Sequence, residues 1–174
     1  GAARAAAVEV ASMGIDLDRE SVATLHAHAY RALGRPTLCV SGPPIDAWNE
    51  ASPQWRLSGG SVAAPDKDTA GSGQGRQPGD RLLASYLRYR AMLRPRELWP
   101  VHVSAFAAQY ETWKRVNDWL DFADVIDEAY ELCPRAPRDA DVIFIDEAQD
   151  HDRAELRLVR KWAEHCEKLV VVGD

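Results

Sequence analysis

The stretch DVIFIDEAQD at residues 141–150 decides the architecture that this sequence predicts. Val142 to Ile145 form an apolar, mostly β-branched run, and the run ends abruptly in two acids, Asp146 and Glu147. An apolar run of this length without polar alternation is typical of a strand buried on both faces of a parallel sheet. Because ligands of open parallel sheets bind outside the carboxyl ends of the strands, the two acids mark a candidate site.

The residues that follow predict a helix and then a second strand. Residues 153–167 have helical periodicity, with Leu156, Val159 and Trp162 on one face. KLVVVGD (168–174) is a second apolar run and ends in Gly-Asp. A helix that joins two such strands is the connection a parallel pair requires. The sequence therefore predicts an α/β fold with a parallel sheet.

The first 33 residues predict helix, strand and helix. Residues 2–13 are rich in Ala, the best helix former, and Gly14 follows as a stop. Residues 21–25 are short and partly β-branched, which predicts a buried strand. Residues 26–33 predict a helix that Gly34 and Pro36 end.

Residues 34–80 differ in composition from the rest of the chain. They hold eight of the 11 glycines and six of the 10 prolines, which predicts a loop or mobile linker outside the core. Trp48, Trp55 and Leu57 could pin part of this segment to a neighbouring surface. Helical periodicity returns at Arg81, and the predicted helices carry their apolar faces on three sets of residues: Leu82, Tyr86, Tyr89 and Leu93; Phe106, Tyr110, Trp113, Val116 and Leu120; Phe122, Val125, Ile126, Ala129 and Leu132.

Composition limits the classes of protein that this chain can be. Its 174 residues are 46% hydrophobic, and 21 Lys plus Arg against 27 Asp plus Glu give a net charge of −6. A generic basic coat for nucleic acid is excluded, so any nucleic-acid contact must be local. No apolar run has the length of a membrane helix, so we expect no membrane partner. Three distant cysteines without a CxxC pair favour neither zinc nor disulfides, and predict a reducing, cytoplasmic compartment.

The two acids after the strand have a clear chemical use and a plainer alternative. One carboxylate can hold a hydrated Mg²⁺ on the phosphates of a nucleotide, and its neighbour can orient or deprotonate an attacking water. Alternatively, Asp146 and Glu147 only begin a solvated turn and favour the N-terminus of the next helix. The full string IDEAQD favours the functional interpretation.

DVIFIDEAQD resembles motif II, the Walker B segment, of superfamily 1 helicases of the UvrD/Rep type, which carry DExxQ followed by Asp. Four further stretches are similar to family segments in the family's order. ARAAAVEV (3–10) is similar to the end of motif Ia, and TLHAHAYRAL (24–33) is similar to motif Ib. DFADVI (121–126) resembles the segment upstream of motif II, and KLVVVGD (168–174) resembles the strand that leads into motif III.

The resemblance implies roles for particular residues. Asp146 would organise Mg²⁺ through water, Glu147 would be the general base for attack on the γ-phosphate of ATP, and Gln149 would sense that phosphate. Asp174 would lie at the same nucleotide site, as the Asp of the Gly-Asp pair in motif III. Thr24, Leu25 and His26 would lie on a track for single-stranded DNA.

The resemblance also implies a division of the chain. It predicts a partial P-loop NTPase fold, with a RecA-like parallel sheet and a mostly helical insertion. Residues 1–33 and 121–174 would be two pieces of the first RecA-like domain, and residues 34–120 an inserted 1B-type subdomain beside the DNA. The partners would be single-stranded DNA and a second RecA-like domain, with 3′-to-5′ polarity implied by the family.

Parts of the family's pattern do not occur in this sequence. A phosphate loop needs GxxxxGK[ST], but none of the four lysines follows a glycine, and GSGQGR (71–76) has no lysine. We therefore expect the sequence to be an internal fragment of a longer ATP-dependent DNA helicase or translocase. The alternatives are an inactive helicase-derived module that binds nucleic acid or protein, and the motor part of a helicase–nuclease.

A basic and aromatic segment offers a second candidate surface for DNA. Residues 81–96 contain five arginines and no acid, with tyrosines interleaved. Arginines on phosphates and aromatic rings on bases hold single strands, so Arg88 and Arg94 are candidate DNA-binding residues. A solvated helix face with its tyrosines in the core explains the same pattern equally well.

Overall fold

The computed structural model describes residues 21–59 and 77–174. The helix predicted over residues 2–13, the motif Ia-like stretch 3–10 and the glycine-rich run 71–76 lie outside the described residues. Within the described residues no helix is long and apolar enough to cross a membrane.

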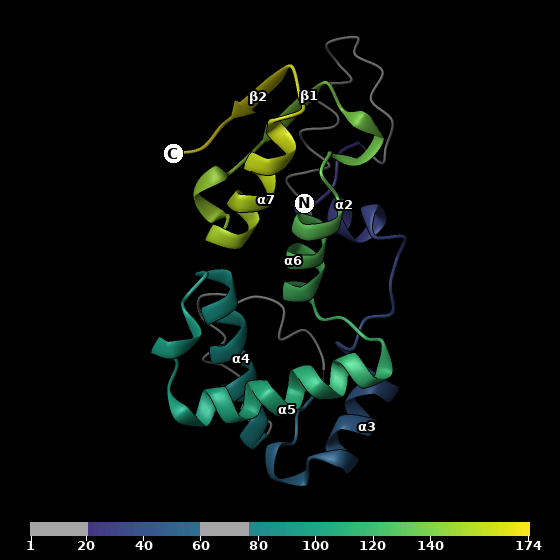
Figure 1. Ribbon diagram of the computed structural model, residues 1–174, viewed down its shortest axis with the longest axis vertical. Coiled ribbons are helices and arrows are strands. Elements are labelled where there is room, and N and C mark those ends of the chain that lie inside the picture. The colour runs from purple at the N-terminus through teal and green to yellow at the C-terminus, as the bar shows by residue number, and fades with distance from the viewer. Residues whose placement is uncertain (1–20, 60–76) are drawn as a thin grey trace.

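The described chain is a mixed α/β structure made mostly of helices (Figure 1). The two strands β1 (Val142–Ile145) and β2 (Lys168–Val171) pair in parallel, from Val142 opposite Lys168 to Ile145 opposite Val171. The predicted strand–helix–strand unit is therefore confirmed. The helices are α2 (Leu25–Ala32), α3 (Pro43–Ala51), α4 (Pro78–Ala91), α5 (Val101–Asn117), α6 (Phe122–Leu132) and α7 (Arg153–Ala163), with 3₁₀ turns η1 (Pro53–Trp55), η2 (Arg96–Leu98), η3 (Pro137–Asp139) and η4 (Ala148–Asp150).

The buried side chains form two hydrophobic cores. The first core joins α2, α6 and α7 to the end of β1, with Leu158 and Trp162 of α7 among its members. The second joins α3, α4 and α5, with Trp48, Tyr86 and Phe106 fully buried. Figure 1 shows these groups as an upper and a lower half, with α6 above α5. The first core is thus built from residues before position 39 and after position 110 in the sequence. The buried residues of the second core all lie between positions 39 and 110.

Residues 21–25 do not form the predicted strand. Residues 21–23 are a turn, Thr24 is the N-cap of α2, and Leu25 is the first residue of the helix. The Thr24 hydroxyl accepts a hydrogen bond from the Ala27 amide at 3.2 Å. This cap satisfies an amide that the first turn leaves without a helical partner, and it outweighs the weak strand preference of Val22 and Thr24.

The prediction that residues 34–80 lie outside the core is wrong for part of this segment. Pro43 and Pro44 begin α3, where their missing amides are not needed, and Trp48 of that helix is fully buried. The Trp48 indole donates to the Trp55 carbonyl at 2.7 Å, and Leu57 is buried beside it. The prolines here start helical turns, so their number does not indicate a linker.

The apolar face of α5 also differs from the prediction. Phe106 and Tyr110 are buried, but Val116 is 77% exposed and Leu120 lies beyond the helix, which ends at Asn117. The next inward position after Tyr110 is occupied by Lys114, which is buried. The apolar pattern gives no signal for an inward lysine, because a buried cation requires partners that only the tertiary structure supplies.

Lys114 lies at the centre of an ion-pair network between the two cores. Its ammonium contacts Asp121 at 2.5 Å and also Asp124, the two acids that form the capping box of α6. Arg90 of α4 contacts Asp124 at 2.5 Å and Asp127 at 2.6 Å. Burial raises the pKa of Asp124, but the charges of Lys114 and Arg90 outweigh burial and hold that pKa below its usual value. The network therefore fixes α6 against α4 and α5.

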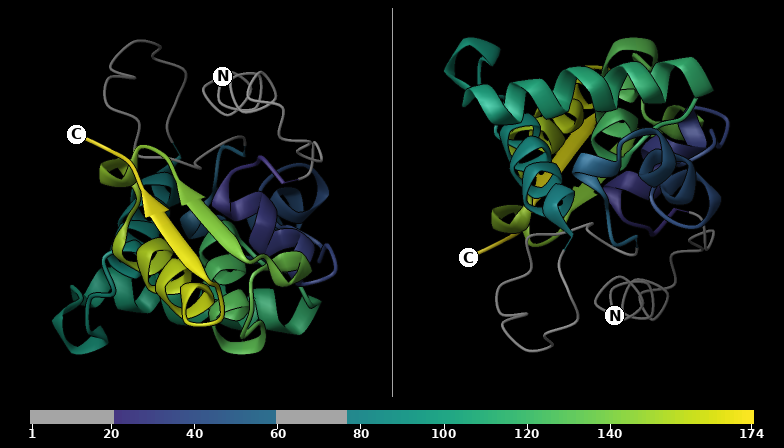
Figure 2. Two further views of the ribbon diagram at one scale, coloured as in Figure 1. Left: turned by 90° about the horizontal axis from the view of Figure 1, so that it is seen from above. Right: turned by 90° about the horizontal axis from the view of Figure 1, so that it is seen from below.

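The strands are less buried than the sequence predicts. Ile145 is buried, but Phe144 is 72% and Val171 57% exposed. Figure 2 shows the two strands side by side above the helices, which cover one face of the pair. The prediction of burial on both faces is wrong for the described residues, because none of their elements covers the outer face.

We expect Asp121→Ala to destabilise the protein by roughly 3–5 kcal/mol, the usual cost of removing one partner of a buried ion pair. The substitution removes the α6 cap and a carboxylate that is 2.5 Å from Lys114. Thermal unfolding followed by circular dichroism measures the effect, with Glu131→Ala, an exposed acid of the same helix, as the control. Equal melting temperatures for both variants would show that the network contributes nothing to stability.

Candidate functional site

The carboxyl end of β1 turns sharply at the two acids. Ile145 anchors the strand in the core, and Glu147 has left-handed backbone angles, φ 50° and ψ 48°, before the turn η4. Such a conformation is uncommon for a residue with a side chain and is found often at functional turns. The Glu147 amide donates to Asp146 Oδ1 at 3.0 Å, which fixes the Asp146 carboxylate at the strand end.

Gln149 joins the acids to the end of β2. Its side-chain amide nitrogen donates to Glu147 Oε2 at 2.6 Å, and its Oε1 accepts from the Asp174 amide at 3.2 Å. The Ala148 amide donates to the Val172 carbonyl at 3.0 Å, which holds the two strand ends together. The structure therefore brings together Asp146, Glu147, Gln149 and Asp174, the four residues for which the resemblance implies a nucleotide site.

The chain passes so close to Gln149 at Gly173 that a side chain there would collide with it. A Cβ atom at position 173 would lie 2.3 Å from Gln149 Oε1 and 3.1 Å from the Ala148 amide nitrogen. The glutamine amide would have to move, and its bonds to Glu147 and Asp174 would break. Glycine is thus the residue that lets Gln149 connect the two strand ends.

The four side chains fit a hydrated Mg²⁺ and a nucleotide phosphate better than a closed metal site. All four residues are exposed, and Asp146 Oδ2 has no hydrogen-bond partner among the described residues. In the part of the chain that the structure describes, no three His, Cys, Asp or Glu side chains gather as metal ligands. Mg²⁺ in phosphate-handling proteins takes one or two carboxylates and completes its shell with water and phosphate oxygens.

Thr24, Leu25 and His26 lie at the start of α2, but they face different surroundings. Thr24 is exposed, whereas Leu25 is only 8% exposed and packs in the first core. The suggested DNA contact of Leu25 needs correction in this respect, because its side chain supports α2 from inside. His26 is partly buried, and its ring meets Phe122 edge-on at 5.7 Å.

His26 also contacts Glu155, an acid that the sequence interpretation missed. Its Nδ1 lies 3.2 Å from Glu155 Oε1, and His151 Nδ1 lies 3.2 Å from Glu155 Oε2. Glu155 also accepts from the Asp152 amide at 3.0 Å, as the distal half of the capping box of α7. The spacing Asp-x-x-Glu at 152–155 is a sequence signal for that box, but the long-range contact to His26 has no local signal.

These contacts shift the pKa of Glu155. Burial raises it, but the hydrogen bond with His26, the Asp152 amide and the two histidines outweigh burial and lower the pKa to about 2. The ionised carboxylate therefore fastens the start of α2 to the start of α7, only a few residues after Gln149.

The basic segment at residues 81–96 is used partly by the fold. Tyr86 is fully buried, and Arg90 belongs to the ion-pair network of α6. The interpretation with tyrosines in the core is correct for Tyr86, but Arg90 does not lie on a solvated face, because its side chain is 13% exposed. Arg88 is exposed, and Arg94 lies over the Tyr89 ring at 4.7 Å with its side chain at the surface, so both stay candidates for DNA contact.

The fold and the site define a mixed α/β protein whose strand ends carry an acidic turn bridged by a glutamine. Residues 87–174, half of the chain, match the family model for the UvrD/REP helicase N-terminal domain. The chain therefore belongs to the UvrD/Rep helicase family. It is similar to the ATP-dependent DNA helicase PcrA of Bacillus subtilis, with 38% identity over 79 residues, which cover 41% of this chain and 11% of PcrA. No solved structure matches the chain.

We expect Glu155 to make stability depend on pH. Its folded pKa of about 2 lies below its ordinary value of 4.5, so its contribution is fully present above pH 4.5 and is lost as pH falls toward 2. Glu155→Gln should therefore lower the melting temperature at pH 7. The difference in melting temperature between this variant and the unsubstituted protein should shrink as the pH falls from 4.5 to 3. Thermal melts across this range test it, with Glu131→Gln as control, and a gap that stays constant with pH would contradict the linkage.

Proposed function

We propose that this chain is part of an ATP-dependent DNA helicase or translocase, and that it contributes the acidic half of the ATP site. Family membership supports the proposal, and one observation carries it. The acidic turn after β1 is bridged through Gln149 to the end of β2, so the residues that the resemblance assigns to hydrolysis share one surface. A solvated turn without function would not need a glutamine bonded to two strand ends.

Each residue of the turn has a role in this proposal. Asp146 would hold water ligands of Mg²⁺ through its free carboxylate oxygen, and the ion would neutralise charge on the phosphates of bound ATP. Glu147 would accept the proton of the attacking water with the carboxylate that Gln149 orients. A change in the contact of Gln149 would reach both Glu147 and Asp174, so Gln149 would sense the γ-phosphate.

Single-stranded DNA is the proposed track. Thr24 and His26 at the exposed start of α2, and Arg88 and Arg94 on and after α4, would contact it, with Leu25 supporting α2 from the core. The net charge of −6 restricts DNA contact to such local patches. His26 would carry two contacts, one to DNA and one to Glu155, and would thereby connect the track to the segment after Gln149.

The wider assignment rests on the family. We assign residues 1–33 and 121–174 to a RecA-like domain and 34–120 to an inserted 1B-type subdomain, which the two separate cores support. A phosphate loop, a second RecA-like domain, 3′-to-5′ polarity and a cytoplasmic location belong to the full-length protein in this proposal.

A second candidate is a helicase-derived module that binds DNA or protein without hydrolysis. It predicts DNA binding that does not depend on nucleotide. The motor part of a helicase–nuclease is a variant of the first proposal, and it predicts the same ATP site.

The full-length protein should be a DNA-stimulated ATPase that Glu147→Gln slows by at least about a hundredfold, since a general base contributes at least that much. Steady-state ATP turnover with and without a single-stranded oligonucleotide measures the loss. Fluorescence anisotropy should show that the variant binds the oligonucleotide with an affinity within twofold of the unsubstituted protein. The control Glu167→Gln changes an exposed acid just after α7.

The outcomes separate the candidates. Turnover unchanged in Glu147→Gln would refute its assignment as the base. An unsubstituted full-length protein that binds DNA without hydrolysing ATP would favour the binding module.

A further inference from the structure

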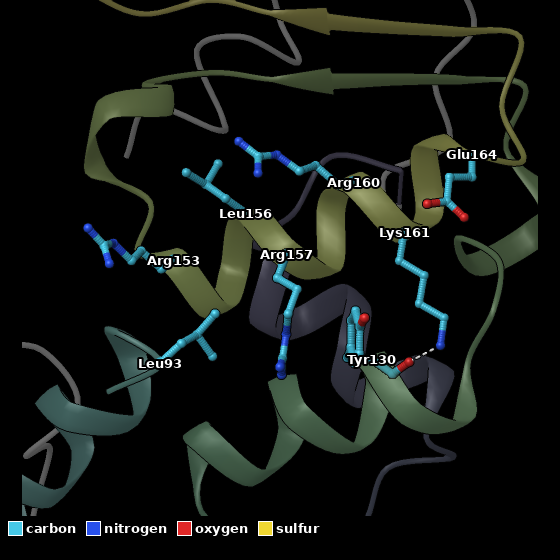
Figure 3. A pocket seen from close by; sticks show the side chains of 8 residues that line it. All are labelled: Leu93, Tyr130, Arg153, Leu156, Arg157, Arg160, Lys161 and Glu164. Carbon is cyan, nitrogen blue, oxygen red and sulfur yellow. Dashed lines mark hydrogen bonds between the residues drawn. The ribbon is translucent and has the colours of Figure 1, made fainter. Parts of the chain in front are cut away.

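A groove of about 680 Å³ runs along the outer side of α7 (Figure 3). Its other wall comes from Leu93, just after α4, and from Tyr130 of α6. The proposed ATP site uses none of the groove's residues, although Arg153 is only three residues after the end of η4. The groove-lining residues that matter here are Leu93, Arg153, Leu156, Arg157, Arg160 and Lys161.

The groove is strongly cationic in a protein whose net charge is −6. Four of its lining residues are Arg or Lys, and one, Glu164, is acidic. Arg157 pairs with Asp127 at 2.8 Å, and Lys161 donates to the Tyr130 carbonyl. Within residues 21–59 and 77–174, Arg153 and Arg160 are exposed and form no ion pair.

The two unpaired arginines flank an apolar floor. They are seven residues apart, so they lie on one face of α7, about 10 Å apart along its axis. Leu156 lies between them on α7, and Leu93, 39% exposed, lines the groove on the other side of the helix (Figure 3). Leu93 is held there by left-handed backbone angles, φ 52°. The surface thus alternates charge, apolar contact and charge.

This arrangement is poorly suited to base stacking. Single strands are held by a positively charged groove together with aromatic rings on which bases stack. Tyr130 is the aromatic residue that lines the groove, and its ring stands between two cations, with Arg157 Cζ 4.1 Å and Lys161 Nζ 4.7 Å from its centroid (Figure 3). Both faces of the ring are therefore covered by cations. A ligand in the groove would meet arginines and leucine side chains instead.

We propose that this groove binds an acidic segment of a partner protein, in which an apolar side chain is flanked by two carboxylates about 10 Å apart. The carboxylates pair with Arg153 and Arg160, for which bidentate geometry is available. The apolar side chain packs against Leu156, between the two arginines, and is removed from water there, which an inorganic anion or a bare phosphate chain would not achieve. This interaction is separate from ATP hydrolysis and does not depend on it.

The test uses the full-length protein at 0.15 M salt and a fluorescein-labelled 14-residue peptide. The peptide is built of Ala and Gln, with Glu at positions 4 and 11 and Leu at positions 7 and 8. Fluorescence anisotropy should show saturable binding that Arg153→Glu with Arg160→Glu weakens at least tenfold. Replacing both Glu of the peptide by Gln should weaken binding to the same extent.

The matched control is Arg81→Glu with Arg115→Glu, two exposed arginines outside the groove, which changes the net charge equally. Binding to this control should stay within twofold. Leu156→Ala, which leaves the charges in place, should weaken binding about threefold or more. Circular dichroism melts establish that each variant is folded, and the milder pair Arg153→Gln with Arg160→Gln replaces the reversal if the latter unfolds.

Three results would overturn the proposal. Absence of saturable peptide binding is the first, and equal weakening by the groove and control variants is the second. The third is a groove variant that binds a labelled oligo-dT strand of fifteen nucleotides tenfold more weakly but binds the peptide unchanged. That result would make the groove a nucleic-acid site.

Discussion

The buried ammonium of Lys114 constrains the rest of the structure. A cation that is 4% exposed has to be neutralised, and the two carboxylates that do so, Asp121 and Asp124, are also the cap of α6. The start of α6 is therefore fixed by α5. Arg90 of α4 pairs with Asp124 and Asp127, and Arg157 of α7 also pairs with Asp127. The helices of both cores meet at this cluster, which is worth little as net stability but costs much to break.

The candidate site depends on this framework indirectly. β1 ends where the first core holds Ile145, and the exposed acids follow within two residues. Their geometry comes from short-range devices, a left-handed Glu147 and a glutamine amide that only a glycine at 173 leaves room for. A rigid scaffold with an exposed, hydrogen-bonded turn is what binding a polar ligand requires, because the ligand must reach the carboxylates while their positions stay fixed.

Local patterns predicted much of the fold, and long-range contacts explain what they missed. The parallel strand–helix–strand unit and α4 to α7 have strong periodicity, and the acid turn follows from DVIFIDEAQD. The inward Lys114, by contrast, is intelligible only with Asp121 beside it, and α3 was missed because its prolines start helical turns. The role of Glu155 depends on His26, which lies more than a hundred residues earlier. No window of local sequence contains such a pair.

Helix α7 connects three of the surfaces proposed for function, namely the start of α2, the acidic turn and the cationic groove. Its first turn holds His26 of α2 through Glu155, its inner face carries Leu158 and Trp162 of the core, and its outer face lines the cationic groove. Two residues separate its N-terminus from η4, which carries Gln149 of the acidic turn. A ligand on α2 would shift the turn only by the difference in its binding free energy between two positions of α7. The pair His26–Glu155 gives the proposed DNA track a direct physical route to the proposed ATP site, which needs no chain of intermediates through the core.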